Sequence, residues 1–356
     1  MNEESVFMGV EHSTNRFNQL ALAATRRQAL PIAVYPGLAL TGGKVSDIVT
    51  NAAAQIETQV ALRERYRTAF VLSAMDLSAE AEAFGCSIHL SENEVPTVTG
   101  RLVTDLAGVR RLAIPQPGDK RTGVYLEAVR GLRKLPGNPL VLGGCIGPFS
   151  LAARMVGVSE AMELTVTEPE LMHALIAKSA EFLATYVHAF RAAGAEGVIM
   201  AEPAAGLLSP GALAGFSSAY IKPLGQSLED GHFALILHNC AARLPHLSAV
   251  LTSGLRSFHF GAPMDLAAAL AKVPPEVVVC GNLDPAAVFC QSTPAQVRLA
   301  ASDLLAQTKS FPNFVISSGC DLPAGTKLEN LDALYQTVAA QPAHVTAAKM
   351  NQSIVI

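Results

Sequence analysis

The chain has 356 residues, of which 50% are hydrophobic and 16% are charged, and its formal net charge is −4. This length suits one large α/β barrel of about 250 residues with insertions, and the apolar content is enough for a sizeable core. The slightly acidic balance and the lack of a basic run argue against nucleic acid as a partner.

The sequence also carries no recognisable export or membrane signal. Its opening stretch, MNEESVFMGVEHSTNRFNQ, contains acidic residues and lacks the long apolar core of a secretory signal. The longest uncharged stretches contain several Gly and Pro, which is typical of loops and not of membrane spans. Six cysteines without a leader favour reduced thiols. We therefore expect a cytoplasmic protein that does not bind membranes, with cysteines available as metal ligands or core residues.

Eight short apolar runs occur along the chain, and most of them are followed by a helical pattern. Their almost continuous apolar character is typical of strands that are buried on both faces, as in a parallel sheet. We predict strands at residues 31–36, 68–76, 139–145, 197–202, 234–240, 256–261, 277–282 and 314–320.

The helices between these runs have clear end signals. Residues 168–194 carry Pro169 near the first turn and Gly194 at the end. Residues 292–309 begin with a Ser/Thr cap and end on Lys309, which suits the helix dipole. Residues 85–100 break the alternation, and their strand-like pieces around Ser91–Asn93 predict a β-hairpin inserted after the second strand.

Eight strands that alternate with helices predict an α/β fold of the (β/α)8 TIM-barrel type with this inserted hairpin. An open, doubly wound sheet is the alternative, because one miscounted strand changes one fold into the other. We found no linker or repeat. We therefore expect residues 1–30 to form an N-terminal lead-in and residues 31–345 to form a single barrel domain, and the oligomeric state stays open.

The active sites of such barrels lie at the carboxyl ends of the strands. Residues at that position in this chain are rich in metal ligands: Tyr35, Asp76, Cys145, Glu202, His238, Cys240, His259, Cys280, Asn282 and Cys320. His238 and Cys240 point to the same side of an extended chain, and Cys320 ends the last strand, which can lie across the barrel mouth. A His/Cys/Cys set selects zinc and leaves one position open, the pattern of catalytic sites.

The same residues also fit a purely structural role, with His238 as a hydrogen-bonded core histidine and the cysteines as small hydrophobic residues. The spacing alone does not decide between these readings. We expect structural roles for His259 and for four of the cysteines, Cys86, Cys145, Cys280 and Cys290. The stretch GLALTGGKV (37–45) resembles a phosphate loop but lacks the hydroxyl residue after its lysine, and no G-x-G-x-x-G follows a strand.

Several motifs resemble a known family in their order along the chain: VYPGLALTG, DLSAEAEAFG, GPFSLAARMVG, LHNC, CGNLDP and SSGCDLPAGTKLENLDAL. From about residue 30 to 340 the sequence resembles the uroporphyrinogen decarboxylase superfamily. It is most similar to the branch of methylcobamide:coenzyme M methyltransferases and related corrinoid-protein methyltransferases. The resemblance implies a (β/α)8 barrel.

The resemblance further implies a zinc site made by His238, Cys240 and Cys320. Glu202, at the end of the fourth predicted strand, is the candidate for a resting fourth ligand, and a role as a loop carboxylate or as a neighbour of the ligands is equally compatible with the sequence. Decarboxylases of the superfamily carry an Arg-rich stretch after the first strand, which binds the carboxylates of a porphyrinogen. This chain has YPGLALTG there instead, and buried carboxylates without cations are costly. Two arginines precede the strand, Arg26 and Arg27, and we expect them at the opposite rim.

The implied activity is a zinc-dependent methyl transfer from protein-bound methylcobalamin to a thiol such as coenzyme M, or to another acceptor such as tetrahydrofolate. The methyl donor would be a corrinoid protein docked at the barrel mouth. Zinc deprotonates the thiol, and two cysteine thiolates keep the metal a weak Lewis acid, so that the bound sulfur stays nucleophilic. The alternatives are a tetrapyrrole decarboxylase and a non-catalytic corrinoid-binding protein.

Three further residues are expected at the barrel mouth. Asp76 matches an acidic position of the superfamily, where it would act in catalysis, hold the corrinoid or substrate, or orient a ligand. Tyr35 and Asn282 are expected to contact the corrinoid. For Asp76 a plain helix-capping role before LSAEAEAFG is equally compatible with the sequence.

Overall fold

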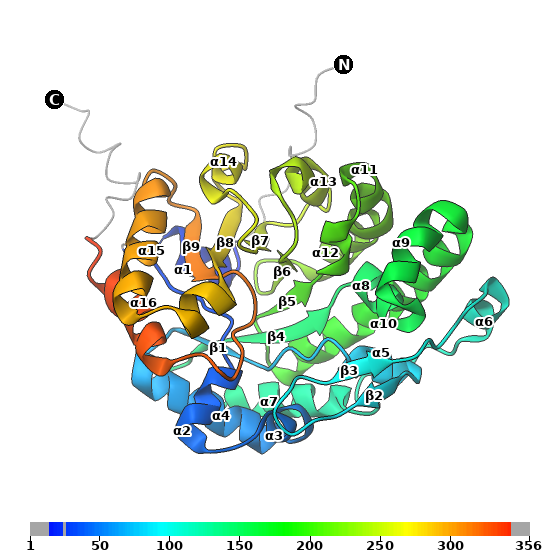
Figure 1. Cartoon of the computed structure of the whole chain (residues 1–356), viewed down its shortest axis with the longest axis horizontal. Helices are drawn as coiled ribbons and strands as arrows, with labels where there is room; N and C mark the ends of the chain where they lie inside the picture. The colour runs from blue at the N-terminus through cyan, green and yellow to red at the C-terminus, as the bar shows by residue number, and fades with distance from the viewer. Residues whose placement is uncertain (1–13, 24–25, 343–356) are drawn as a thin grey trace.

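The computed structural model describes residues 14–23 and 26–342, and its centre is a curled parallel sheet surrounded by helices (Figure 1). Seven strands form this sheet in the order β1-β4-β5-β6-β7-β8-β9. Their bounds are β1 Phe70–Leu72, β4 Leu140–Ile146, β5 Gly197–Ala201, β6 Ala234–Asn239, β7 Ser257–Phe260, β8 Val278–Leu283 and β9 Phe314–Ser318. All neighbouring strands are parallel.

Helices connect the strands and lie around the outside of the sheet (Figure 1). The α-helices before β5 are α1 Arg16–Leu22, α2 Leu38–Thr41, α3 Val45–Thr50, α4 Ala52–Tyr66, α5 Ala79–Phe84, α6 Leu106–Arg111, α7 Thr122–Leu132, α8 Pro148–Val156, α9 Val158–Thr167 and α10 Pro169–Ala193. Those after β5 are α11 Pro210–Leu213, α12 Ala219–Leu228, α13 Leu247–Leu251, α14 Leu266–Leu270, α15 Pro294–Gln307 and α16 Leu328–Ala339. None of the described helices is long and apolar enough to cross a membrane.

Seven of the eight predicted strands form, and they are buried along their length apart from Asn282, which is only half-buried. This agrees with the apolar runs, because helices cover one face of the sheet and side chains fill the other. The helix predicted at 168–194 is α10, and Gly194 ends it in a left-handed conformation with φ 104°. The second predicted helix is α15, where the Thr293 hydroxyl accepts a hydrogen bond from the Gln296 amide.

The strand predicted at residues 31–36 does not form, and this corrects the expected count of eight. Residue 29 makes one isolated parallel bridge to Ile316 of β9, and the chain then turns into a short 3-10 helix at Tyr35–Gly37. Pro31 has no amide proton to donate, and the Ile32 amide donates to the Ser318 hydroxyl (3.0 Å) and not to a strand backbone.

Two glutamines of α4 occupy the space in which the backbone of residues 31–36 would pair with β1. The Gln59 side chain accepts from the Leu72 amide (2.9 Å) and donates to the Ala33 carbonyl (2.7 Å). Gln55 accepts from the Ala74 amide (3.0 Å). The buried backbone groups beside β1 are therefore satisfied by side chains, and the sheet has seven strands where a regular barrel has eight.

Two further segments stand outside the main sheet. Within residues 85–100, β2 (Ser87–His89) and β3 (Thr97–Thr99) pair antiparallel. In the predicted lead-in, α1 lies at the amino ends of the strands, where Asn18 accepts a hydrogen bond from the Ser257 hydroxyl of β7 (2.7 Å). Residues 1–13 of that lead-in and 343–345 of the predicted domain lie outside the described residues.

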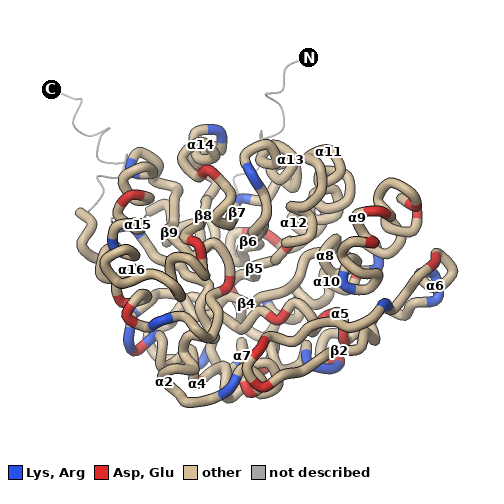
Figure 2. Tube along the Cα trace, in the orientation of Figure 1, with Lys and Arg blue, Asp and Glu red and all other residues tan. Residues whose placement is uncertain are grey.

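Charged residues lie mostly on the outer helices and loops (Figure 2). Glu80 of α5 is an exception, since its side chain is buried. One carboxylate oxygen accepts from the Ile146 amide (3.0 Å), while the other has no hydrogen-bond partner among the described residues. Burial raises the pKa of Glu80 from 4.5 to about 7, because the charged form is poorly solvated there.

The Glu80→Gln variant is expected to be less sensitive to alkaline pH than the wild type. The folded protein keeps the Glu80 proton up to its raised pKa of about 7, whereas the unfolded chain releases it near its ordinary pKa of 4.5. Stability therefore falls as pH rises between these values, by about 3 kcal/mol in all. Urea unfolding at pH 5 and pH 8.5 should show this loss reduced in the variant. Glu127→Gln, at an exposed position, serves as the control, and equal losses in both variants would contradict the assignment.

Candidate metal centre

Strand β6 positions the first two candidate ligands. His238 lies near its end, in register with Ala201 of β5 and His259 of β7. The next residue, Asn239, accepts hydrogen bonds on Oδ1 from the amides of residues 241 and 242 (3.2 and 2.9 Å). This turn takes the chain out of the sheet immediately after Asn239, so that Cys240 lies at the rim close to His238.

Two glycines let the third candidate ligand approach from β9, although β7 and β8 separate that strand from β6. A Cβ atom at Gly261 would lie 2.1 Å from the Cys240 carbonyl oxygen. A Cβ atom at Gly319 would lie 2.8 Å from the Ala262 amide nitrogen. The backbone after β7 is thus packed between the two cysteine-bearing turns, and only glycine permits this closeness. Cys320 follows Gly319 and reaches the same point as Cys240.

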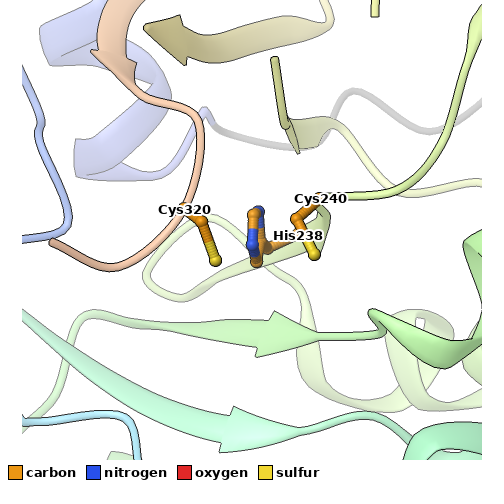
Figure 3. Close-up of side chains that lie close together, drawn as sticks. All are labelled: His238, Cys240 and Cys320. Atoms are coloured by element: carbon orange, nitrogen blue, oxygen red, sulfur yellow. The ribbon is translucent and has the colours of Figure 1, made fainter. Parts of the chain in front are cut away.

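The three predicted ligands do come together. The ligand atoms of His238, Cys240 and Cys320 all lie within 4.8 Å of one another. Figure 3 shows the three side chains converging, with Cys320 coming from the loop after β9. His238 is 1% exposed, and both cysteines are partly exposed. One nitrogen and two sulfurs at this spacing can hold a tetrahedral metal ion and leave its fourth position for another ligand.

The hydrogen bonds behind His238 were not anticipated from the sequence. Its Nδ1 lies 2.8 Å from Nδ1 of His259, whose Nε2 lies 2.8 Å from the Ser317 hydroxyl. The Ser317 hydroxyl in turn donates to the Leu30 carbonyl. Burial lowers the pKa of His259 well below its ordinary value, with a further contribution from His238. The other ring nitrogen of His238, Nε2, is buried and has no hydrogen-bond partner of good geometry among the described residues, although the ring lies close enough to Cys320 to lower the pKa of that thiol.

The two cysteines behave as a coupled pair. A hydrogen bond between their side chains lowers the pKa of Cys240 to about 7, while the same bond and then burial raise the pKa of Cys320 to about 12. The two shifts are of opposite sign because one proton is shared between the sulfurs. The pair therefore holds one thiolate near neutral pH, and a bound cation would favour the second.

Glu202 is not part of this group of three. It follows β5, and its carboxylate accepts from the Phe149 amide (2.9 Å) and from the amide and hydroxyl of Ser150 (3.0 and 2.7 Å). These donors belong to the first turn of α8, where a carboxylate is favoured. Burial nevertheless raises the pKa of Glu202 to about 7. Its role as a fourth ligand stays a prediction, and it would require at least one carboxylate oxygen to give up its hydrogen bonds to this helix end.

Asp76 lies at the same rim and belongs to a buried ionic network. Its carboxylate pairs with Arg121 and accepts from the Ser78 amide (3.0 Å) and the Tyr125 hydroxyl (3.1 Å). Arg121 also donates to Glu82 (2.6 Å). Arg121 could not be identified from the sequence, because an arginine in the polar stretch GDKRTG is usually solvated. The capping contact of Asp76 to the Ser78 amide is present. A residue that only caps a helix would not need a buried arginine beside it, yet Asp76 pairs with Arg121.

The remaining predicted residues are held by backbone contacts. The buried Tyr35 hydroxyl donates to the Met75 carbonyl (3.2 Å), and the Asn282 amide donates to the carbonyls of Gly261 and Met264 (3.0 and 2.6 Å). Asn282 therefore fixes the turn that packs against Cys240. Among the other cysteines, Cys86, Cys145 and Cys280 are buried and Cys290 is partly exposed. Arg27 donates to carbonyls before and within β9, which places it at the opposite rim from Cys320.

Known proteins resemble this chain along most of its length. The family model of uroporphyrinogen decarboxylase (URO-D) matches residues 24–341. The methylcobamide:CoM methyltransferase MtbA of Methanosarcina acetivorans is 27% identical over 293 residues, which is 80% of this chain and 85% of that protein. The uroporphyrinogen decarboxylase of Psychromonas ingrahamii is 26% identical over 328 residues, 87% of this chain and 90% of that protein.

Solved structures share the fold. A methyltransferase from Methanosarcina mazei superposes with a TM-score of 0.80 at 22% identity and covers 89% of this chain and 96% of its own. A B12-independent methionine synthase from Shewanella sp. W3-18-1 reaches a TM-score of 0.54 at 14% identity, over 88% of this chain and 94% of its own. The fold is therefore that of TIM-barrel-like methyltransferases, with the curled seven-stranded sheet described above.

Proposed function

The chain belongs to the uroporphyrinogen decarboxylase family, and from this premise we propose that it is a zinc-dependent methyltransferase that acts on a methylated corrinoid. The methyl group moves from protein-bound methylcobalamin to a thiol acceptor such as coenzyme M, or to another acceptor such as tetrahydrofolate. The single observation that carries the proposal is the convergence of one imidazole nitrogen and two cysteine sulfurs within 4.8 Å at the rim of the sheet.

The alternative within the family is a tetrapyrrole decarboxylase, and the charges at the rim weigh against it. A substrate with many carboxylates needs unpaired cations where it binds. The segment after Pro31 contributes none before Lys44. Arg121 is shared between Asp76 and Glu82, so it is already neutralised. A decarboxylase would also have no use for two thiols beside a partnerless imidazole nitrogen.

The metal would be held by Nε2 of His238 and by the sulfurs of Cys240 and Cys320. When bound, zinc would keep the acceptor thiol ionised near neutral pH and hold it in place. The acceptor sulfur then attacks the methyl carbon of the corrinoid, forming a C–S bond as the Co–C bond breaks, and both electrons of that bond stay on cobalt as Co(I). Both cysteines are partly exposed, so a corrinoid protein docked at the rim could reach this point.

Other residues take supporting roles in this proposal. Glu202 would be the resting fourth ligand, which the acceptor thiolate would displace, and its pKa near 7 suits a group that can take up a proton at the first turn of α8. Asp76 holds substrate or corrinoid through the network that it shares with Arg121. Tyr35 and Asn282 are proposed to contact the corrinoid. Residues 31–345 form one catalytic domain.

Cobalamin spectroscopy tests the proposal directly. Methylcobalamin is mixed with the zinc-loaded protein and a panel of thiols that includes coenzyme M, homocysteine and cysteamine, and a parallel assay contains tetrahydrofolate. We expect loss of the methylcobalamin absorption with at least one acceptor, and expect chelation of the metal to abolish it. Demethylation that is absent with every acceptor would refute the proposal. Conversion of uroporphyrinogen to coproporphyrinogen by the protein would support the decarboxylase instead.

A further inference from the structure

We infer that His259 is a positioning residue for the metal site, which fixes the proton of His238 on Nδ1 and leaves Nε2 as the ligand atom. This inference rests on the proposed function only in that His238 binds a metal. Neither the sequence motifs nor the three ligands themselves require a second histidine behind the first, and His259 was expected to be structural.

The proton positions follow from counting donors along the buried chain of contacts. A carbonyl oxygen can only accept hydrogen bonds, so the Ser317 hydroxyl donates its single proton to the Leu30 carbonyl. The Ser317 oxygen must then accept from Nε2–H of His259, at 2.8 Å. A neutral His259 consequently has its lone pair on Nδ1. The group facing that lone pair at 2.8 Å is Nδ1 of His238, which must carry the proton.

The outcome is a His238 ring whose Nε2 lone pair is free beside the two sulfurs of the candidate site. This matches the finding that Nε2 is buried without a hydrogen-bond partner among the described residues. A buried polar nitrogen left in that state costs free energy, which a metal ion would recover. His259 is 0% exposed and lies in register with His238 on the adjacent strand, so its ring cannot turn away without disturbing β7. The fold therefore prepares one tautomer of the ligand.

The inference is tested by zinc affinity, measured by competition with a chromophoric chelator. His259→Leu removes the acceptor and is expected to weaken zinc binding about 10- to 100-fold, the usual effect of losing a hydrogen-bond partner of a metal ligand. His259→Asn places an amide oxygen close to the position of the Nδ1 atom and should recover most of that affinity. Wild-type affinity in His259→Leu, or equal losses in both variants, would overturn the inference.

A control separates positioning from general loss of stability. Asn313 is buried at the opposite end of β9, where its amide donates to the Val277 carbonyl (2.8 Å). Asn313→Leu should lower the thermal unfolding temperature and leave zinc affinity unchanged. A wild-type protein that binds no zinc would refute the inference together with the zinc site. A protein that binds zinc with the expected variant pattern but does not demethylate methylcobalamin would refute the proposed function alone.

Discussion

The Cys320→Ala variant should lose both its zinc and its thiol-dependent demethylation of methylcobalamin. Removal of one member of the converging group of three leaves His238 and Cys240 of that group to hold the metal. Because even a hydrogen-bond partner of a ligand is worth about 10- to 100-fold in affinity, loss of the ligand itself should cost more than about 100-fold. The measurements are zinc content after dialysis and the decay of the methylcobalamin spectrum.

Cys290→Ala is the matched control for this experiment. Cys290 is also partly exposed and makes a weak contact with the Thr326 hydroxyl at 3.7 Å, but it does not belong to the group of three. We expect wild-type zinc content and rate from this variant. Circular dichroism of both variants will show whether the fold is kept. Full activity and stoichiometric zinc in a folded Cys320→Ala protein would end the case for the metal site.

The largest effect on stability is expected from Arg121→Met. Asp76 and Arg121 form a buried pair, with side-chain exposures of 0% and 9%. Methionine keeps much of the packing volume but leaves the Asp76 carboxylate without its counter-charge. An uncompensated buried charge costs about 3–5 kcal/mol. Urea unfolding at pH 7 should therefore show a loss of that order, and the added substitution Asp76→Asn should restore part of it.

An ion pair at the surface supplies the comparison. Arg65 and Asp332 are joined at 2.6 Å with side-chain exposures of 39% and 27%, so water screens their interaction. Arg65→Met is expected to cost at most about 1 kcal/mol. If Arg121→Met lowered the free energy of unfolding no more than Arg65→Met does, Asp76 and Arg121 would not form a buried charge pair.

The candidate metal site was largely accessible from the sequence, because strand ends in a parallel sheet meet at one rim. The i and i+2 positions of His238 and Cys240 required no tertiary information, and seven of eight strands were predicted at the right place. Arg121 and the hydrogen bond between His238 and His259 were not predicted. Both depend on which side chains meet across separate elements. The local sequence around Arg121 does not distinguish it from a solvated arginine, and the sequence around His259 does not distinguish it from a core histidine.

The first predicted strand, at residues 31–36, was wrong because tertiary contacts override its local pattern. Residues 31–36 have the apolar composition of a strand, and local pattern alone cannot reveal that Gln55 and Gln59 would take its place beside β1. In the sequence of α4 these glutamines look like ordinary surface residues, yet both are buried. Their burial becomes favourable only once β1 presents unpaired backbone amides to them.

The sequence by itself determined the alternation of buried strands and helices and the residue types at the strand ends, because burial and periodicity are encoded locally. Only the tertiary structure decided that the sheet has seven strands, that Cys320 meets Cys240 across two intervening strands, and which nitrogen of His238 is free. The physical reason is that these outcomes depend on long-range packing, in which close backbone contacts at Gly261 and Gly319 and buried hydrogen bonds select one arrangement.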